Sequence, residues 1–263
     1  PRWLMTHGRI AEAEQGVGAV ESTLRGLEPV HASQRIALTH RVVRMRDVWH
    51  TLVQRYAERS LFAFVLMASQ AFFYNAIFFT YALVLGTFFG VPDHRVGLYI
   101  LPFAAGNFLG PLLLGRLFDV VGRRPLIFAT YAASGVLLAI TAALFDAGLL
   151  GATGQTVAWS VVFFFASAAA SSAYLTVGEV FPLEIRALAI AIFYCIGTGV
   201  GGASGPLIFG ALIGTGERRL IAAGYLLGSL LMIAAALLTL RLGIAAERRP
   251  LEDVATPLSR ADR

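Results

Sequence analysis

Six long apolar stretches with few charges constrain this chain more than any other feature of its sequence. Each is long enough for a helix to cross the hydrocarbon core of a bilayer, which takes about 20 residues. The composition agrees, because 57% of the 263 residues are hydrophobic and 14% are charged, against about 25% charged in soluble domains. We therefore predict an all-α integral membrane protein with six transmembrane helices. The stretches cover residues 61–89, 97–118, 125–145, 157–180, 187–213 and 220–242.

All 21 basic residues are arginines, and they are divided unequally between the two sides that six spans define. Eighteen lie in the two tails and in the connectors after the second and fourth spans, whereas Arg95, Arg218 and Arg219 lie on the other side. Because cytoplasmic loops are rich in arginine and lysine, this split predicts a multi-pass protein of the cell membrane with both ends of the chain in the cytoplasm. The basic excess then reflects topology rather than nucleic-acid binding.

The residues outside the spans are predicted to form a cytoplasmic segment at 1–60 and a cytoplasmic tail at 243–263. Segment 1–60 has no apolar core of the length that a signal peptide needs. It contains two candidate amphipathic helices, one with apolar residues at helical spacing from Ile10 onward and one at 42–56 that combines arginines with Trp49. We expect these helices on the membrane surface or on the helix bundle; a regulatory or partner-binding role is the alternative.

Charged residues occur at the cytoplasmic ends of four spans, where the helix dipole disfavours them. Asp119 and Glu179 lie at carboxyl ends. Arg123, Arg124 and Arg186 lie at amino ends. An arginine fork can hold a carboxylate with two parallel hydrogen bonds, so pairing would offset both penalties. We therefore predict a charged cluster that acts as a cytoplasmic gate; solvated residues that only mark the cytoplasmic side are the alternative.

Two connectors resemble loops of the major facilitator superfamily. Residues 115–126, GRLFDVVGRRPL, resemble the acidic-x-x-Gly-Arg-Arg loop after the second helix of the carboxy-terminal half. Residues 179–186, EVFPLEIR, resemble the Glu-x-Phe-Pro-x-x-x-Arg loop two helices later. The opening PRWL is similar to the end of the Pro-Glu-Ser-Pro-Arg-Trp-Leu motif that follows the sixth helix of sugar porters. The resemblance extends over the whole chain.

This resemblance implies the central loop and helices seven to twelve of a twelve-helix transporter, with the amino-terminal six-helix half missing. The start at Pro1 rather than at a methionine fits this expectation of a fragment. In the family, the loop charges form an inner salt-bridge network that breaks and reforms during alternating access. The matching positions here are Arg2, Asp119, Arg123, Arg124, Glu179 and Arg186.

Polar side chains within the spans mark the expected substrate site, because a polar group that faces lipid lacks partners. In the first span, Gln70 and Tyr74 lie one turn apart, and Asn75 is beside them. Residues 69–81 look like the seventh helix of sugar porters, in which Gln and Asn at these places bind hydroxyls by donating and accepting hydrogen bonds. Bonding between helices is the alternative. The candidates from other spans are Asn107, Tyr174, Tyr194 and Thr198.

The chain departs from the sugar-porter pattern in two places, of which the one in the fourth span concerns the substrate. Residues 170–174, ASSAY, replace the Gly-Pro-x-x-Trp of the fourth span, and residues 247–253 only loosely match the Pro-Glu-Thr-Lys-Gly motif near the end of sugar porters. The chain is therefore more similar to the broader metabolite-proton symporter branch, whose substrates include sugars, polyols and organic or aromatic acids.

Glycines recur at every fourth position in two spans. The fifth span has Gly197, Gly201 and Gly205, and the second has Gly106 and Gly110. Small residues at this period let two helices approach closely. Close packing is our preferred interpretation, and bending at the glycines and the nearby prolines is the alternative.

The sequence thus predicts a secondary active transporter that moves a small solute by alternating access and is driven by protons. Because no Asp or Glu lies mid-span, the titrating carboxylate would belong to the missing half, as in related symporters. The expected partners are the lipid bilayer, a small-molecule substrate, a proton and that half. The alternatives are a drug or metabolite efflux facilitator and an inactive half-transporter.

An enzyme is disfavoured, because all five histidines lie in tails or a connector and the spans contain no nucleophile with a base. No cofactor or metal is expected. A permease subunit of an ATP-driven transporter is also disfavoured, because the connectors are too short for a coupling loop. The single Cys195 lies in an apolar run, where we expect an inert buried thiol.

Overall fold

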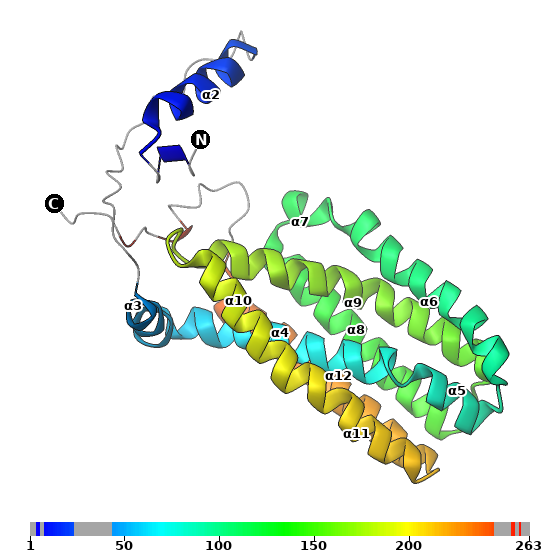
Figure 1. The fold of residues 1–263 in the computed structure, drawn as a ribbon. Helices are drawn as coiled ribbons and strands as arrows, with labels where there is room; N and C mark the ends of the chain where they lie inside the picture. The colour runs from blue at the N-terminus through cyan, green and yellow to red at the C-terminus, as the bar shows by residue number, and fades with distance from the viewer. Residues whose placement is uncertain (1–3, 6–7, 24–43, 245–253, 256–257, 259–263) are drawn as a thin grey trace.

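The computed structural model describes residues 4–5, 8–23, 44–244, 254–255 and 258. These residues form helices and turns, and no β-strand occurs among them. Figure 1 shows the long helices side by side in one bundle, with α2 (Ile10–Thr23) outside it. The other elements are α3 (Met45–His50), the π-helical turn η1 (Thr51–Arg55), α4 (Ala57–Phe78), α5 (Tyr81–Phe89), α6 (Asp93–Leu114), α7 (Leu117–Val120), α8 (Arg123–Asp146), α9 (Ala152–Val180), α10 (Arg186–Gly197), the π-helical turn η2 (Thr198–Gly202), α11 (Ala203–Gly214) and α12 (Arg218–Leu242).

Six helical segments are long and apolar enough to cross a membrane, which confirms the predicted number. Each begins slightly before the corresponding apolar stretch, because polar residues such as Arg123 join the first helical turn. The segments are Ala57–Phe78, Asp93–Val120, Arg123–Asp146, Ala152–Val180, Arg186–Gly214 and Arg218–Leu242.

The first predicted stretch, 61–89, is not one helix, and in this respect the prediction was wrong. α4 ends at Phe78, and α5 begins after a two-residue turn. On both sides of the break, side chains bond back to backbone carbonyls: the Asn75 amide donates to Ala71 O (2.7 Å), and the Thr80 hydroxyl donates to a carbonyl one turn earlier. Such local bonds compete with those of the helix. Hydropathy does not detect them.

Four spans form the centre of the bundle. α8 packs against α12 and α9, and α4 packs against α9 and α12. The other two spans lie on this centre: α6 packs on α9, and α10, η2 and α11 pack on α4. Of the most apolar windows of these two spans only 17% and 22% are buried, against 44% to 61% for the other four. They therefore direct most of their surface away from the chain's own core.

Glycines form the contacts of both outlying spans. A Cβ on Gly106 or Gly110 of α6 would overlap backbone carbonyl oxygens of α9. A Cβ on Gly201 would overlap the carbonyl oxygen of Ala68 on α4. The structure thus supports the packing interpretation. The π-helical turn η2 precedes Pro206, which has no N–H for the helix ladder, so this span also contains an irregular segment.

Candidate functional site

At one end of the bundle, Arg123 contacts both predicted gate acids. Its Nη2 atom lies 2.8 Å from Oε1 of Glu179 and 3.7 Å from Oδ1 of Asp119. The Arg123 and Glu179 side chains are only 14% and 19% exposed, whereas Asp119 is 70% exposed. Water screens the Asp119 contact strongly and the Glu179 contact much less. The Arg123–Glu179 contact is therefore the stronger of these two, and it joins the start of α8 to the end of α9.

The backbone before Arg123 explains its position. Gly122 has φ 113°, a region that glycine adopts without a Cβ penalty, and it turns the chain from α7 into α8. Without this turn, Arg123 would not begin a helix beside the end of α9.

The other predicted gate residues are placed differently. Arg186 begins α10, and its Nη2 donates a hydrogen bond to the Phe181 carbonyl oxygen at 3.3 Å, which braces the loop between α9 and α10. Arg124 is exposed. Arg2 lies outside the described residues. The structure thus brings Asp119 and Glu179 to one arginine, Arg123.

Arg59, in the first turn of α4, is a candidate that sequence reasoning missed. Its Nη1 donates to the carbonyl oxygens of Val180 (2.7 Å) and Val254 (2.8 Å). Its guanidinium carbon lies 4.9 Å from the centroid of the Tyr56 ring. Carbonyls at a helix end carry partial negative charge that an arginine offsets. Arg59 therefore connects Val254, in the segment after α12, to Val180, the residue that follows Glu179.

Midway along the spans, polar side chains from three helices meet. The Tyr74 hydroxyl of α4 donates to Oδ1 of Asn107 on α6. The Ser167 hydroxyl of α9 donates to the Asn107 backbone carbonyl at 2.6 Å. The structure thus brings together two predicted site residues and adds Ser167. Sequence reasoning missed this serine, because most serines in apolar helices bond within their own helix.

An aromatic group borders this polar cluster. The ring centroids of Tyr74 and Phe163 are 4.7 Å apart, and those of Phe163 and Phe103 are 4.2 Å apart. The group continues through Phe78 and Tyr81 across the break between α4 and α5. Apolar rings beside a few polar groups are typical of small-molecule sites.

Asn75 points to a different neighbour, the turn η2. A Cβ on Gly202 would lie 3.1 Å from the Asn75 amide nitrogen and 3.2 Å from the Thr198 methyl carbon. Asn75 and Thr198 therefore lie around Gly202, away from the Tyr74 cluster. Gln70 is buried, with 7% of its surface exposed.

Tyr174 of α9 and Tyr194 of α10 form a third group. Their ring centroids are 5.9 Å apart, and both residues are exposed. Six of the seven predicted substrate residues thus form three pairs, Tyr74 with Asn107, Asn75 with Thr198, and Tyr174 with Tyr194.

Arg218, at the other end of the bundle, was counted from the sequence only as a topology marker. It begins α12 and donates to the carbonyl oxygens of Phe88 (3.0 Å) and Phe145 (3.5 Å). Its guanidinium carbon lies 5.2 Å from the Phe145 ring centroid and 5.4 Å from that of Phe89. Arg218 therefore ties the ends of α5 and α8 to the start of α12.

Two further expectations concern cysteine and metals. Cys195 is exposed, and the expectation of a buried thiol was wrong, because Cys195 lies on the outward side of α10 with Tyr194 and Ile196. No group of three or more His, Cys, Asp or Glu residues that could hold a metal ion was found within the described part of the chain.

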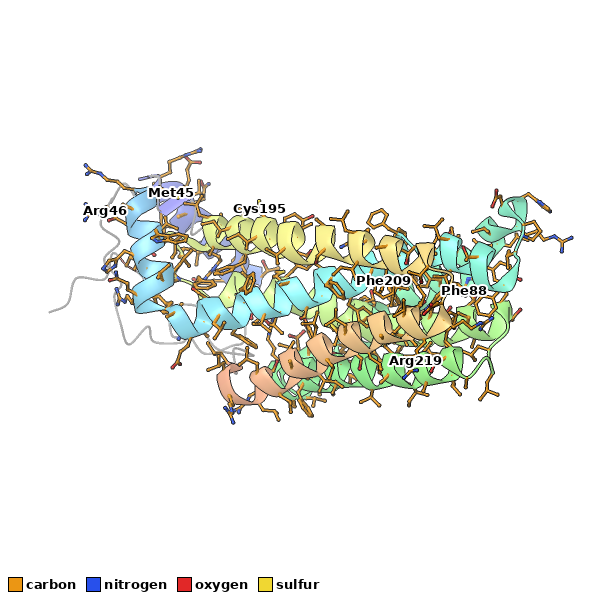
Figure 2. The ribbon with its side chains drawn as sticks, turned by 90° about the horizontal axis from the view of Figure 1, so that it is seen from below. Met45, Arg46, Phe88, Cys195, Phe209 and Arg219 are labelled. Carbon is orange, nitrogen blue, oxygen red and sulfur yellow. The ribbon has the colours of Figure 1, made fainter. Side chains whose placement is uncertain are left out.

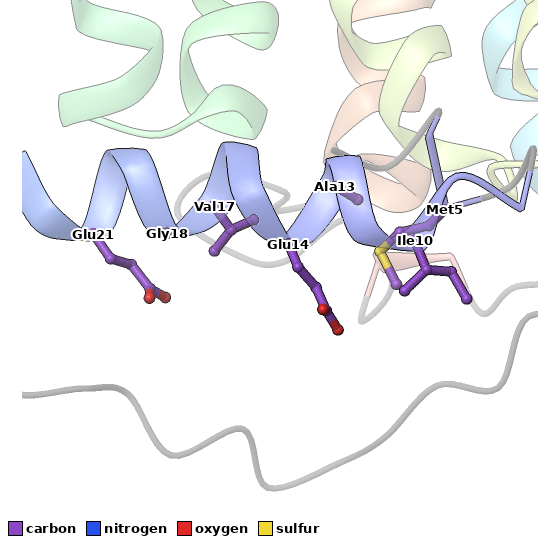
Figure 3. Close-up of a pocket in the computed structure, with 7 residues that line it drawn as sticks. All are labelled: Met5, Ile10, Ala13, Glu14, Val17, Gly18 and Glu21. Carbon is purple, nitrogen blue, oxygen red and sulfur yellow. The ribbon is translucent and has the colours of Figure 1, made fainter.

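A hollow of about 340 Å³ lies on α2, outside the bundle (Figure 3). Its apolar stripe is flanked by Glu14 and Glu21, and it includes no residue of the motifs described above. It is lined by Met5, Ile10, Ala13, Glu14, Val17, Gly18 and Glu21.

A family model described as "Sugar (and other) transporter" matches residues 1–205, which is more than half of the chain. The matched range includes both the Arg123–Glu179 pair and the Tyr74–Asn107 contact. No curated protein matches the chain.

Proposed function

Because this chain belongs to the sugar (and other) transporter family of the major facilitator superfamily, we propose that it takes part in moving a small hydroxylated solute by alternating access. The substrate class is a sugar, a polyol or an organic acid. The protein crosses the membrane several times, and its described residues are helices and turns.

The contact of Tyr74 with Asn107 is the observation that supports this proposal best. A hydroxyl and an amide from two helices meet within mainly apolar spans, with Ser167 alongside. A buried amide both donates and accepts hydrogen bonds, as a solute hydroxyl does. Solute binding would exchange the Tyr74–Asn107 bond for bonds to the solute, so little hydrogen bonding would be lost.

We assign the inner gate to Arg123 and Glu179, with Asp119 on the side that is exposed to water. Separating α8 from α9 would break a charge-assisted contact while water entering the opening re-solvates both ions. The open and closed states can then have similar free energies, which alternating access requires. In this topology the gate faces the cytoplasm, and residues 1–60 and 243–263 are cytoplasmic.

A second six-helix half would cover the outlying spans. α6 and the span from α10 to α11 expose most of their surface, and Tyr174, Tyr194 and Thr198 are exposed on or beside them. In this family of transporters the solute site lies between two halves. We therefore expect these three residues to complete the site only when the other half is present, and the isolated chain not to transport.

Proton coupling would depend on that other half. No Asp or Glu lies mid-span in this chain, so a carboxylate that titrates during transport would be supplied elsewhere. This half would contribute solute contacts and the gate.

The test is uptake by the complete transporter with a panel of sugars, polyols and organic acids, measured with and without a proton gradient. For the transported solute, Tyr74→Phe and Asn107→Leu should raise KM about ten-fold or more, since each removes a hydrogen-bonding group from the site. Tyr99→Phe on α6 is the matched control and should leave KM unchanged. The assignment fails if all three variants have the same KM as the unaltered protein.

A further inference from the structure

Residues 45–55, which comprise α3 and η1, lie across the end of the bundle. Figure 1 views this segment nearly along its axis, and Figure 2, turned by 90°, shows it roughly perpendicular to α4. The corner is at Tyr56, which leaves the helical conformation with φ −123° and ψ 34°. The Ser60 hydroxyl fixes the corner by donating to the Leu52 carbonyl at 2.7 Å. Because α4 crosses the membrane, a segment perpendicular to it lies parallel to the membrane surface.

One side of this segment is packed on the bundle. Val48 and Leu52 are 0% and 2% exposed, and Thr51 is buried with them. The amino end is formed around Asp47, whose carboxylate accepts a hydrogen bond from the Arg44 backbone N–H at 3.4 Å. The segment is therefore held in place, and its orientation determines what its other sides contact.

The next side carries an exposed apolar stripe. Met45, Trp49 and Val53 follow one another at four-residue spacing and are 63%, 61% and 48% exposed. At about 100° per residue this stripe borders the buried side at Leu52. The apolar surface therefore continues from the bundle onto an uncovered face.

Beyond the stripe, the segment is polar and basic. Arg46 and His50 follow around the helix, and Figure 2 shows Arg46 at its outer rim near Met45. Arg44 and Arg55, at the two ends, are also exposed. Around the helix, the side that packs on the bundle is therefore followed by the exposed apolar stripe and then by the basic side. This is the pattern of a helix in the membrane interface, in which an aromatic residue lies at headgroup depth.

We propose that residues 45–55 bind anionic lipid at the membrane surface, with Trp49 at the boundary of the acyl chains and the exposed arginines on headgroup phosphates. The position of the stripe favours lipid over α2 as the occupant, because the stripe and its arginines are continuous with a membrane-spanning helix. A protein partner, including the acidic face of α2 at Glu14 and Glu21, is the contrary outcome of the test.

The first experiment uses Trp49 as a depth probe. The 263-residue chain carrying Trp3→Phe and Trp159→Phe is reconstituted in phosphatidylcholine and phosphatidylglycerol vesicles whose acyl chains are brominated either near the headgroup or near the terminus. Trp49 fluorescence should be quenched more by the shallow bromines than by the deep ones, and weakly by aqueous iodide. The matched control keeps only Trp159, which is 1% exposed within the bundle and should be quenched weakly by both lipids.

Two outcomes overturn the proposal. Strong iodide quenching without lipid quenching would place Trp49 in water. Protection from both quenchers, in vesicles where Trp159 behaves as expected, would mean that protein covers the stripe.

The second experiment tests the charge. Replacing phosphatidylcholine by phosphatidylglycerol should strengthen shallow quenching of Trp49, and Arg44→Gln, Arg46→Gln and Arg55→Gln together should abolish that increase. Each arginine near an anionic surface contributes about five-fold to the binding equilibrium. Arg95→Gln with Arg219→Gln, at the other end of the bundle, is the control and should preserve the increase. Equal quenching with and without phosphatidylglycerol in the unaltered stripe would refute anionic-lipid binding.

Discussion

The Arg123 guanidinium lies 2.8 Å from the Glu179 carboxylate, and both side chains are less than one-fifth exposed. The pair connects two adjacent helices at the end where α9 stops. Glu179 is followed by Val180, whose carbonyl oxygen accepts a hydrogen bond from Arg59. Arg59 also donates to the carbonyl oxygen of Val254, so it connects this end of α9 to Val254.

The Arg123–Glu179 pair should show energetic coupling. Removing one partner leaves the other charge partly buried, so Arg123→Gln and Glu179→Gln should each lower the free energy of unfolding by about 1 to 3 kcal/mol. The double variant should cost less than the sum of the two. Unfolding in detergent by denaturant measures all three, with exposed Arg124→Gln as a control expected within about 0.5 kcal/mol of the unaltered chain. Additive losses would contradict the coupling.

Arg59 should hold the carboxy-terminal segment in place. Arg59→Gln removes charge-assisted bonds to Val180 and Val254, so amide hydrogen exchange near residue 254 should become faster and stability should fall by about 1.5 to 3 kcal/mol. Arg55→Gln is the control, because Arg55 is exposed and its guanidinium carbon is farther from the Tyr56 ring, at 5.8 Å. Unchanged exchange in Arg59→Gln would show that Val254 is held by other contacts.

Gly201 should tolerate no side chain. A Cβ there overlaps backbone atoms of α4, so Gly201→Ala should separate the two helices, cost about 1 to 3 kcal/mol and reduce transport by the complete protein, while membrane insertion stays normal. Gly199→Ala is the matched control, because a Cβ at Gly199 has open space within 4 Å. Normal uptake by Gly201→Ala would contradict this prediction.

Gln155 should be replaceable by an apolar residue with a gain in stability. Within the described part of the chain, its side-chain oxygen and nitrogen are buried without hydrogen-bond partners. A buried polar group without a partner costs about 1 to 3 kcal/mol, so Gln155→Met should raise the melting temperature in detergent.

Gln70→Met serves as the comparison for the Gln155 variant, since Gln70 is also buried but belongs to the candidate solute site. A lower melting temperature for Gln155→Met would mean that an internal water satisfies the amide.

The number and approximate bounds of the spans were predictable, because each span only requires about 20 consecutive apolar residues. Each apolar run in the sequence therefore identifies one span, independently of the rest of the chain. The break after Phe78 was missed, because a two-residue turn inside an apolar run does not change the hydropathy of the run. The exposure of Cys195 was missed for a related reason, since an apolar run has an inward and an outward side that composition does not distinguish.

The candidate site was predictable only in part. Asp119, Arg123 and Glu179 stood out, because charges at the wrong helix ends need partners. Arg59 did not stand out among the nine arginines that precede residue 61, since its partners are backbone carbonyls, which every residue has.

The sequence by itself determined the six membrane-spanning helices, the family and the ionic character of one bundle end. Each of these depends on residue types at short range. Only the tertiary structure decided that Tyr74 meets Asn107 while Asn75 faces η2, and that Arg59 reaches Val254. Such contacts depend on the rotation and spacing of helices far apart in the chain, which glycine contacts such as that of Gly201 with α4 determine.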